Sequence, residues 1–342
     1  MKNKINVGII GKNFGYNVIY KSFSKNKNFK ITAFCHRSKV AEEIKIQKNL
    51  KIYSSWKKLI LDKEIQAIVI ATPPVLHKKI TQFAIKNNKH IFCEKPFTTS
   101  YKEASIVCNL IRKKKYLSHM VNYEFGEIDA FLIFKKKFIN NIKVNNIYLN
   151  WFININKRPK TSWKENHSKG GGAIHNYACH TIYYLESLFG KIASIKTNIL
   201  MGQKNKTKKI NGEFYFANGL SAKLNIQVGS LSKKLYPIHQ LKILTRKKTY
   251  ILETQLNSLS DKFQLISYEN NSRKLRKILI KNKKNEDDFR IQPTFNNSKK
   301  FSQWIIKKKT HQPNFFDAQR THLIINKMLI SSKKRKKIYI KI

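Results

Sequence analysis

Residues 5–18 read INVGIIGKNFGYNV, an apolar run that enters a turn containing glycine. The run from Lys4 to Ile10 predicts a buried parallel strand, and a helix is expected to begin near Phe14 and to end near Phe23. Backbone amides at the N-terminus of such a helix, together with the helix dipole, stabilise a phosphate group. The candidate phosphate-binding residues are Gly11, Asn13, Phe14 and Gly15.

This turn matches the dinucleotide-binding pattern G-x-G-x-x-G only in part. Gly11 fits the first position, whereas Asn13 stands at the second and Tyr16 at the third. Asparagine tolerates a positive φ better than most residues, but it adds a side chain where the phosphate approaches. Taken alone, the motif is therefore equally consistent with an ordinary turn between a strand and a helix.

Strands and helices alternate through the first part of the chain, which predicts a doubly wound, mostly parallel sheet in a dinucleotide-binding domain over residues 1–121. Further strands are expected at Phe29–Cys35, Ala67–Ala71 and His90–Cys93. The expected helices are Val40–Lys48, Ser55–Leu61, His77–Asn87 and Ser100–Lys114.

From residue 122 to residue 342 the pattern changes to longer, alternating segments that are typical of antiparallel strands with one wetted face. These segments predict an α+β domain built on a large, mostly antiparallel sheet. Its strands are expected at Val144–Ile155, Ile192–Leu200, Gly212–Phe216, Leu220–Val228, Leu241–Thr245 and Thr249–Glu253. Helices are expected at Ile128–Phe138, His175–Leu188 and Phe315–Ser331, and Ser267–Asn297 is expected to form a loop and an edge strand.

The formal charge of +50 on 342 residues raises the alternative of a nucleic-acid partner. Lysines are spread along the whole chain, however, together with many Ile, Asn, Tyr and Phe residues. Runs such as Lys135–Lys137 and Lys333–Lys337 are therefore interpreted as solvated surface. We expect no specific nucleic-acid partner.

Neither a membrane-spanning run nor a signal-peptide pattern is found in the sequence, so a cytoplasmic location with no membrane partner is expected. The four cysteines lack paired spacing, which favours reduced thiols over disulfides or a metal site.

The end of the second strand reads Cys35-His36-Arg37-Ser38-Lys39 and contains no acidic residue. An acid at this point would bind the ribose hydroxyls of NAD, whereas Arg37 and Ser38 suit a 2′-phosphate. The sequence therefore favours NADP over NAD, although basic residues could also fall here by chance in so basic a protein.

Three further motifs are more specific. Ala71-Thr72-Pro73-Pro74 with His77 follows one predicted strand, Cys93-Glu94-Lys95-Pro96 follows the next, and residues 170–180 read GGGAIHNYACH. Together with the opening turn they resemble the Gfo/Idh/MocA oxidoreductase family, whose signature is G-G-G-x-L-x-D-x-G-x-H. The resemblance implies that the cofactor also contacts Ala71, Thr72, Pro73, His77, Glu94, Lys95 and Pro96.

Lys95 follows the end of a strand, at the edge where α/β sheets bind ligands. An ammonium group there can hydrogen-bond a reacting hydroxyl or carbonyl and stabilise a developing alkoxide. The alternative is an ordinary surface lysine. Pro96 is expected to stiffen this turn, with a cis bond as one option.

His180 is implied by the resemblance to be the general acid/base, and Asn176 lies four residues earlier on the same helix face. Asn176 replaces the aspartate of the signature and cannot act as a carboxylate base. Tyr183 stands where the family often has a second aspartate. The sequence leaves three explanations open: slower oxidation, a preference for keto reduction, or polar groups supplied by the substrate.

The leading hypothesis is an NAD(P)-dependent enzyme that transfers hydride between nicotinamide and a carbinol or keto carbon of a sugar, sugar nucleotide or polyol. The alternative is a ligand-sensing or scaffold protein that kept the fold and lost the chemistry. The resemblance also implies a homo-oligomer, either a dimer or a tetramer. Substrate contacts are expected from Tyr123, Arg158, Trp163, Lys164 and Asn176.

Overall fold

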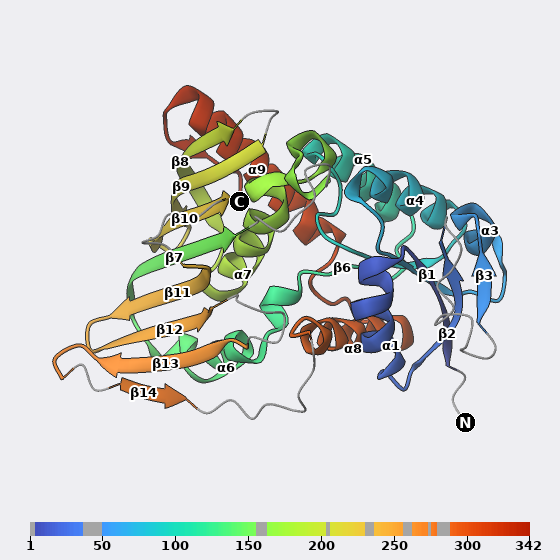
Figure 1. Ribbon diagram of the computed structural model, residues 1–342, viewed down its shortest axis with the longest axis horizontal. Coiled ribbons are helices and arrows are strands. Elements are labelled where there is room, and N and C mark those ends of the chain that lie inside the picture. The colour runs from blue at the N-terminus through green and yellow to red at the C-terminus, as the bar shows by residue number, and fades with distance from the viewer. Residues whose placement is uncertain are drawn as a thin grey trace. The chain divides into compact units, whose positions relative to one another are not determined.

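The computed structural model (Figure 1) describes residues 4–36, 50–154, 163–202, 206–229, 236–255, 262–272, 275–278 and 288–342. The chain forms two compact units. Unit 1 comprises Met1–Glu124 and Arg290–His322, and unit 2 comprises Phe125–Phe289 and Leu323–Ile342. The single domain boundary expected after residue 121 therefore differs from the observed division, because a segment late in the chain returns to unit 1.

Unit 1 is built on a six-stranded sheet in which every neighbouring pair is parallel, as predicted. The strand order is β3-β2-β1-β4-β5-β6, so the order reverses at β1, between β2 and β4. In doubly wound sheets ligands bind at this reversal, at the carboxyl ends of the strands. The strands are β1 Ile5–Ile10, β2 Phe29–Cys35, β3 Lys51–Tyr53, β4 Ala67–Ile70, β5 His90–Cys93 and β6 His119–Val121.

The helices of unit 1 begin where the sequence offers capping or breaking residues. Ser100 caps α5 by accepting from the Glu103 amide at 3.3 Å, and the Glu103 carboxylate in turn accepts from the Thr99 hydroxyl at 2.7 Å. Pro74 occupies the first position of α4. The helices are η1 Gly15–Tyr20, α1 Lys21–Ser24, α3 Trp56–Leu61, α4 Pro74–Lys86, α5 Tyr101–Arg112, α8 Ile291–Lys307 and the first residues of α9 Phe315–Lys334. The helix expected at Val40–Lys48 lies outside the described residues.

The helix α8 was not predicted, because its sequence lies partly in the segment expected to be loop and edge strand. It packs against α1 within unit 1 (Figure 1). Its buried face carries Thr294, Ser298 and Ser302 as well as apolar residues, so the usual apolar period is interrupted. Asn26 of unit 1 donates to the hydroxyls of Ser298 and Ser302, each at 3.2 Å, which satisfies these buried polar groups.

Unit 2 contains a nine-stranded sheet in the order β14-β13-β12-β11-β7-β10-β9-β8-β15. Among the described strands of this sheet only the β7–β10 pair is parallel, so the prediction of a mostly antiparallel sheet is confirmed. Along β7 buried and wetted residues alternate, as expected for a sheet with one covered face. The strands are β7 Val144–Asn154, β8 Ile192–Gly202, β9 Lys206–Phe216, β10 Ser221–Gly229, β11 Ile238–Thr245, β12 Lys248–Thr254, β13 Gln264–Glu269, β14 Leu275–Ile278 and β15 Ile338–Tyr339.

Two helices, α6 and α7, contribute aromatic side chains to the core of unit 2. Phe131 of α6 lies 4.9 Å from the Tyr184 ring of α7, and Phe134 lies 5.6 Å from Tyr250 of β12. The helical segments are η2 Glu124–Glu127, α6 Asp129–Lys137, η3 Ile139–Asn141, η4 Trp163–Glu165, η5 His167–Lys169, η6 Ile174–Ala178, α7 Cys179–Phe189 and the last residues of α9.

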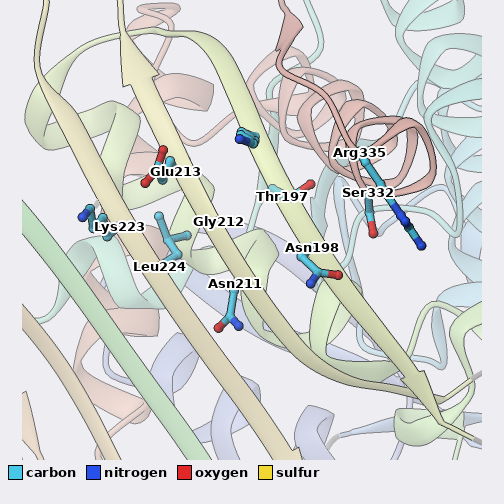
Figure 2. A pocket seen from close by; sticks show the side chains of 10 residues that line it. Thr197, Asn198, Asn211, Gly212, Glu213, Lys223, Leu224, Ser332 and Arg335 are labelled. Carbon is cyan, nitrogen blue, oxygen red and sulfur yellow. The ribbon is translucent and has the colours of Figure 1, made fainter.

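The free edge of β8 is closed by the end of α9. The amide of Thr197 donates to the Ser331 hydroxyl at 3.0 Å, and the amide of Ile199 donates to the Ser332 hydroxyl at 2.9 Å. Beyond them β15 pairs with β8. A hollow of about 700 Å³ opens beside this edge (Figure 2). Its lining includes none of the predicted site residues.

Four histidines, of which His90 is partly buried and the other three are buried, have lowered pKa values, chiefly because burial disfavours the charged imidazolium. The pKa is lowered to about 4 for His90 and His322 and to about 3 for His119 and His239. Folding therefore selects the neutral form of each ring.

We expect the free energy of unfolding to fall as the pH decreases from about 6.5 towards 4, because in this window the unfolded chain binds protons that the folded chain excludes. Each histidine should remove on the order of 2–3 kcal/mol. The buried carboxyl group of Glu94 has the opposite effect, since its pKa is raised to about 8 in the folded chain. The folded chain therefore binds one proton that the unfolded chain does not bind until lower pH, which offsets part of the loss. Urea unfolding at a series of pH values measures the effect. A constant midpoint from neutral pH down to about pH 5 would contradict it.

Candidate functional site

The carboxyl ends of four neighbouring strands meet at one edge of the unit 1 sheet. Backbone hydrogen bonds continue just past the strands there, from Ala71 N to Ile10 O and from Glu94 N to Ile70 O, both at 2.8 Å. Asn122 N likewise donates to Cys93 O at 2.8 Å. The predicted glycine turn, the Ala71–Pro73 turn and the Glu94–Pro96 turn are thereby brought to the same edge.

Gly11 is required by the close approach of two of these turns. Its φ is +123°, and a Cβ atom on it would lie 2.3 Å from the carbonyl oxygen of Ala71. Only glycine fits such a position. At Gly15 an added Cβ would meet Ile9 and Ala71 at ordinary contact distances of 3.4 and 3.5 Å, so this glycine is not forced by its own chain.

The helix after the glycine turn runs without a break from residue 13 to residue 24. Asn13 is exposed at its start and Phe14 is partly buried. The first amides of a helix lack partners within that helix, so they are available to an anion at this end.

His77 connects two of the turns. Its Nδ1 lies 2.9 Å from the carbonyl oxygen of Pro96, and its Nε2 lies 2.7 Å from that of Thr72. The ring is fully buried, and this burial lowers its pKa. A neutral imidazole can donate to only one of the two carbonyls. Both contacts are to the protein's own backbone, so His77 acts on the shape of the two turns.

Glu94 is a buried carboxyl group held by an amide. Asn122 donates to its Oε1 at 2.7 Å and also to the Thr294 hydroxyl at 3.1 Å, while Asn297 donates to the Asn122 Oδ1 at 3.0 Å. Burial and the nearby Glu124 raise the pKa of Glu94 to about 8, against the lowering effects of Asn122, Lys95 and Arg290. The surroundings of this carboxyl group therefore favour its protonated form. The adjacent Lys95 is half-buried, and its bond to Pro96 is cis.

The triple glycine of unit 2 allows a tightly wrapped loop. Gly170 and Gly172 have φ values of +80° and +74°, and a Cβ on Gly171 would lie 2.2 Å from the carbonyl oxygen of Trp163. Trp163 is half-buried and Lys164 is exposed. Because Gly171 has no side chain, η4 can lie directly against the glycines. This segment contains Trp163 and Lys164, two of the predicted substrate residues.

His180 is buried and rests on an aromatic cluster within unit 2. Its ring lies 4.5 Å from Phe125 and 6.3 Å from Trp151. Trp151 in turn stacks on His239 at 3.9 Å with an interplanar angle of 11°, and the Tyr184 hydroxyl lies 3.0 Å from the His239 Nε2. These contacts fix the surroundings of the His180 ring.

Asn176 is buried one turn before His180, in the π-helical segment η6. Tyr183 is buried as well, and its ring is close enough to Gly126 that an added Cβ there would lie 3.0 Å from the ring. An aromatic side chain therefore fills the place of the second family aspartate. His175 packs on His167 at 4.7 Å, in keeping with a structural role.

The remaining predicted site residues are Arg37, Ser38, Arg158 and Tyr123. Arg37, Ser38 and Arg158 lie outside the described residues, and Tyr123 is fully buried just after β6. Within the described ranges no group of three or more His, Cys, Asp or Glu side chains is arranged to hold a metal ion. No described helix has both the length and the apolar character that a membrane span needs.

Sequence reasoning missed the supporting residues Thr294 and Asn297 on α8 and Trp151 and His239 on the strands. A signal for α8 was present: Ile291, Thr294, Ser298, Phe301 and Ile305 follow helical spacing once small polar residues are allowed on the buried face. The Trp151–His239 stack depends on the pairing of β7 with β11, which local patterns do not reveal.

Two family models match the chain. One is described as an oxidoreductase family NAD-binding Rossmann fold and matches residues 5–123; the other is the oxidoreductase family C-terminal alpha/beta domain and matches residues 137–337. An uncharacterized oxidoreductase of Synechocystis sp. is 26% identical over 244 residues, which cover 65% of each chain. A levoglucosan dehydrogenase of Pseudarthrobacter phenanthrenivorans is 31% identical over 150 residues, covering 42% of this chain and 37% of that protein.

The matched region thus spans less than two thirds of the length of both relatives. Among solved structures, a levoglucosan dehydrogenase in complex with NADH superposes with a TM-score of 0.84 at 18% identity, covering 99% of this chain and 100% of that one. At this identity the likeness shows the fold alone. Because the two family models cover most of the residues, the chain belongs to the Gfo/Idh/MocA family of oxidoreductases.

Proposed function

We propose that the protein is an NAD(P)-dependent oxidoreductase that transfers hydride between nicotinamide and a carbinol or keto carbon of a sugar, sugar nucleotide or polyol. The observation that carries the proposal is the meeting of the Gly11 turn and the Glu94-Lys95-Pro96 turn at one sheet edge, in a family whose N-terminal model is NAD-binding. The levoglucosan dehydrogenase relative supports a sugar-like substrate.

The residues of unit 1 fit a dinucleotide. Gly11 lets the glycine turn lie directly against the Ala71 turn, and the amides from Asn13 to Gly15 suit a pyrophosphate. Ala71, Thr72 and Pro73 form the next turn of the proposed cofactor site, and Glu94 lies in the turn after that. His77 holds these two turns through Thr72 and Pro96.

In the proposed chemistry a bound nicotinamide supplies or accepts the hydride. Lys95 hydrogen-bonds the reacting oxygen and stabilises its alkoxide character. His180 gives or takes the hydroxyl proton, because an imidazole nitrogen can donate a proton in one form and accept one in the other. Asn176 can hydrogen-bond a substrate hydroxyl but cannot take its proton, so proton transfer falls to His180.

Further substrate contacts are proposed for Tyr123, Arg158, Trp163 and Lys164. An indole such as that of Trp163 offers a flat face to a sugar ring, and the two cations suit a phosphate or carboxylate on the substrate. A homo-oligomer, dimer or tetramer, and a cytoplasmic location complete the proposal; they rest on the family resemblance and on the sequence pattern.

The variants Lys95→Met and His180→Ala should each lower turnover by about 100-fold or more, since each removes a group that acts on the reacting oxygen or its proton. Cofactor affinity should stay within a few-fold. Nicotinamide fluorescence titration and turnover on a panel of sugars, sugar nucleotides and polyols measure the two quantities. Lys79→Met on α4 and His311→Ala serve as matched controls in unit 1.

If the wild-type protein binds the cofactor but turns over no compound on the panel, and neither variant changes this behaviour, the protein would instead belong to the scaffold alternative.

NADPH should bind more tightly than NADH, because Arg37 and Ser38 suit a 2′-phosphate. The double variant Arg37→Glu, Ser38→Ala should weaken NADPH binding by about tenfold or more and leave NADH binding nearly unchanged. Parallel titrations with the two cofactors measure this. Equal losses for both cofactors would count against a 2′-phosphate contact.

A further inference from the structure

Arg290 brings a positive charge from late in the chain to the sheet edge of unit 1. Its guanidinium carbon lies 5.1 Å from the centre of the Phe14 ring, in the glycine turn after β1. Its charge also acts on Glu94, in the turn after β5. Arg290 therefore lies within reach of two turns assigned to the cofactor, although nothing in its local sequence marked it.

The backbone beside Arg290 is fixed to the helix that follows the glycine turn. Ser22 of α1 is fully buried, and its hydroxyl, which can donate to one acceptor at a time, lies 2.9 Å from the carbonyl oxygen of Ile291 and 2.7 Å from that of Val18. Farther along α8, Thr294 and Asn297 bond to Asn122. The chain that follows Arg290 is thus anchored by hydrogen bonds within unit 1.

We propose that Arg290 is a cofactor-binding residue whose guanidinium pairs with the pyrophosphate of the bound nicotinamide dinucleotide. This inference rests on the proposed function. The Phe14 ring attracts the guanidinium of Arg290 and holds it beside the glycine turn. The planar fork of N–H donors on a guanidinium matches two phosphate oxygens. Phe14 thereby orients Arg290 at the turn whose amides suit the same group.

The proposal also accounts for the incomplete glycine pattern. The second glycine of G-x-G-x-x-G normally lets the backbone approach the pyrophosphate, and here Asn13 occupies that position. Arg290, the residue before α8, adds electrostatic attraction for the pyrophosphate. This attraction compensates for the more distant backbone contact that the Asn13 side chain imposes. The raised pKa of Glu94 weakens its attraction for this cation, whereas a pyrophosphate carries its negative charge at neutral pH.

The test compares Arg290→Gln with Arg112→Gln in the full-length protein. Arg112 is a matched control, because its guanidinium lies 5.2 Å from the Phe316 ring in the same unit but belongs to the last turn of α5. We expect Arg290→Gln to weaken NADPH, NADH and ADP-ribose by about tenfold or more and to leave AMP, which lacks a pyrophosphate, nearly unaffected. Arg112→Gln should change none of them. Arg290→Lys should recover part of the loss.

Calorimetric titration gives the affinities, and thermal melting of each variant reports whether the fold is kept. Equal affinities for wild type and Arg290→Gln would overturn the assignment of Arg290 while leaving the proposed function intact, and so would equal losses for AMP and ADP-ribose. If Arg290→Gln fails to fold, Arg290→Lys tests the assignment of Arg290 in its place. Wild-type affinity of Arg290→Lys for ADP-ribose would contradict a contact that needs the forked guanidinium. A wild-type protein that binds none of the dinucleotides overturns both proposals.

Discussion

The side-chain amide of Asn122 holds together the parts of unit 1 on which the candidate site depends. Its two N–H groups serve Glu94 and Thr294, and its carbonyl accepts from Asn297. Burying a carboxyl group without a hydrogen-bond partner would cost several kcal/mol of folding free energy. A hydrogen-bond partner is needed whether or not the group is protonated. The amide therefore lets an acidic residue stand next to Lys95 inside the protein, provided that α8 is present to hold the amide.

Much of the fold could be predicted because its strands are short apolar runs bounded by turn residues. The predicted bounds of β2 and β5 coincide with the observed Phe29–Cys35 and His90–Cys93, since parallel strands buried on both faces read as continuous apolar segments. The helix α8 escaped prediction for the opposite reason. Its buried face is half polar, and those polar groups are satisfied by Asn26 and Asn122, which lie far away in sequence.

Part of the candidate site could likewise be predicted from the sequence, and part of it could not. Turns after parallel strands meet at one edge by a general rule, so the convergence of Gly11, Ala71 and Glu94 followed from strand order alone. Partners delivered by other elements did not follow from any local pattern. Arg290 at Phe14 depends on the return of the chain to unit 1, and His239 beneath Trp151 depends on the register of β11 against β7.

The two serine hydroxyls that cap the amides of β8 have a practical consequence for anyone who produces this protein. An uncovered edge strand is a template for pairing with other chains. Shortening the C-terminal end before Ser331 would remove both caps and β15 together, and it would expose a row of amides beside the sheet. Such a truncated product should aggregate through the exposed edge of β8.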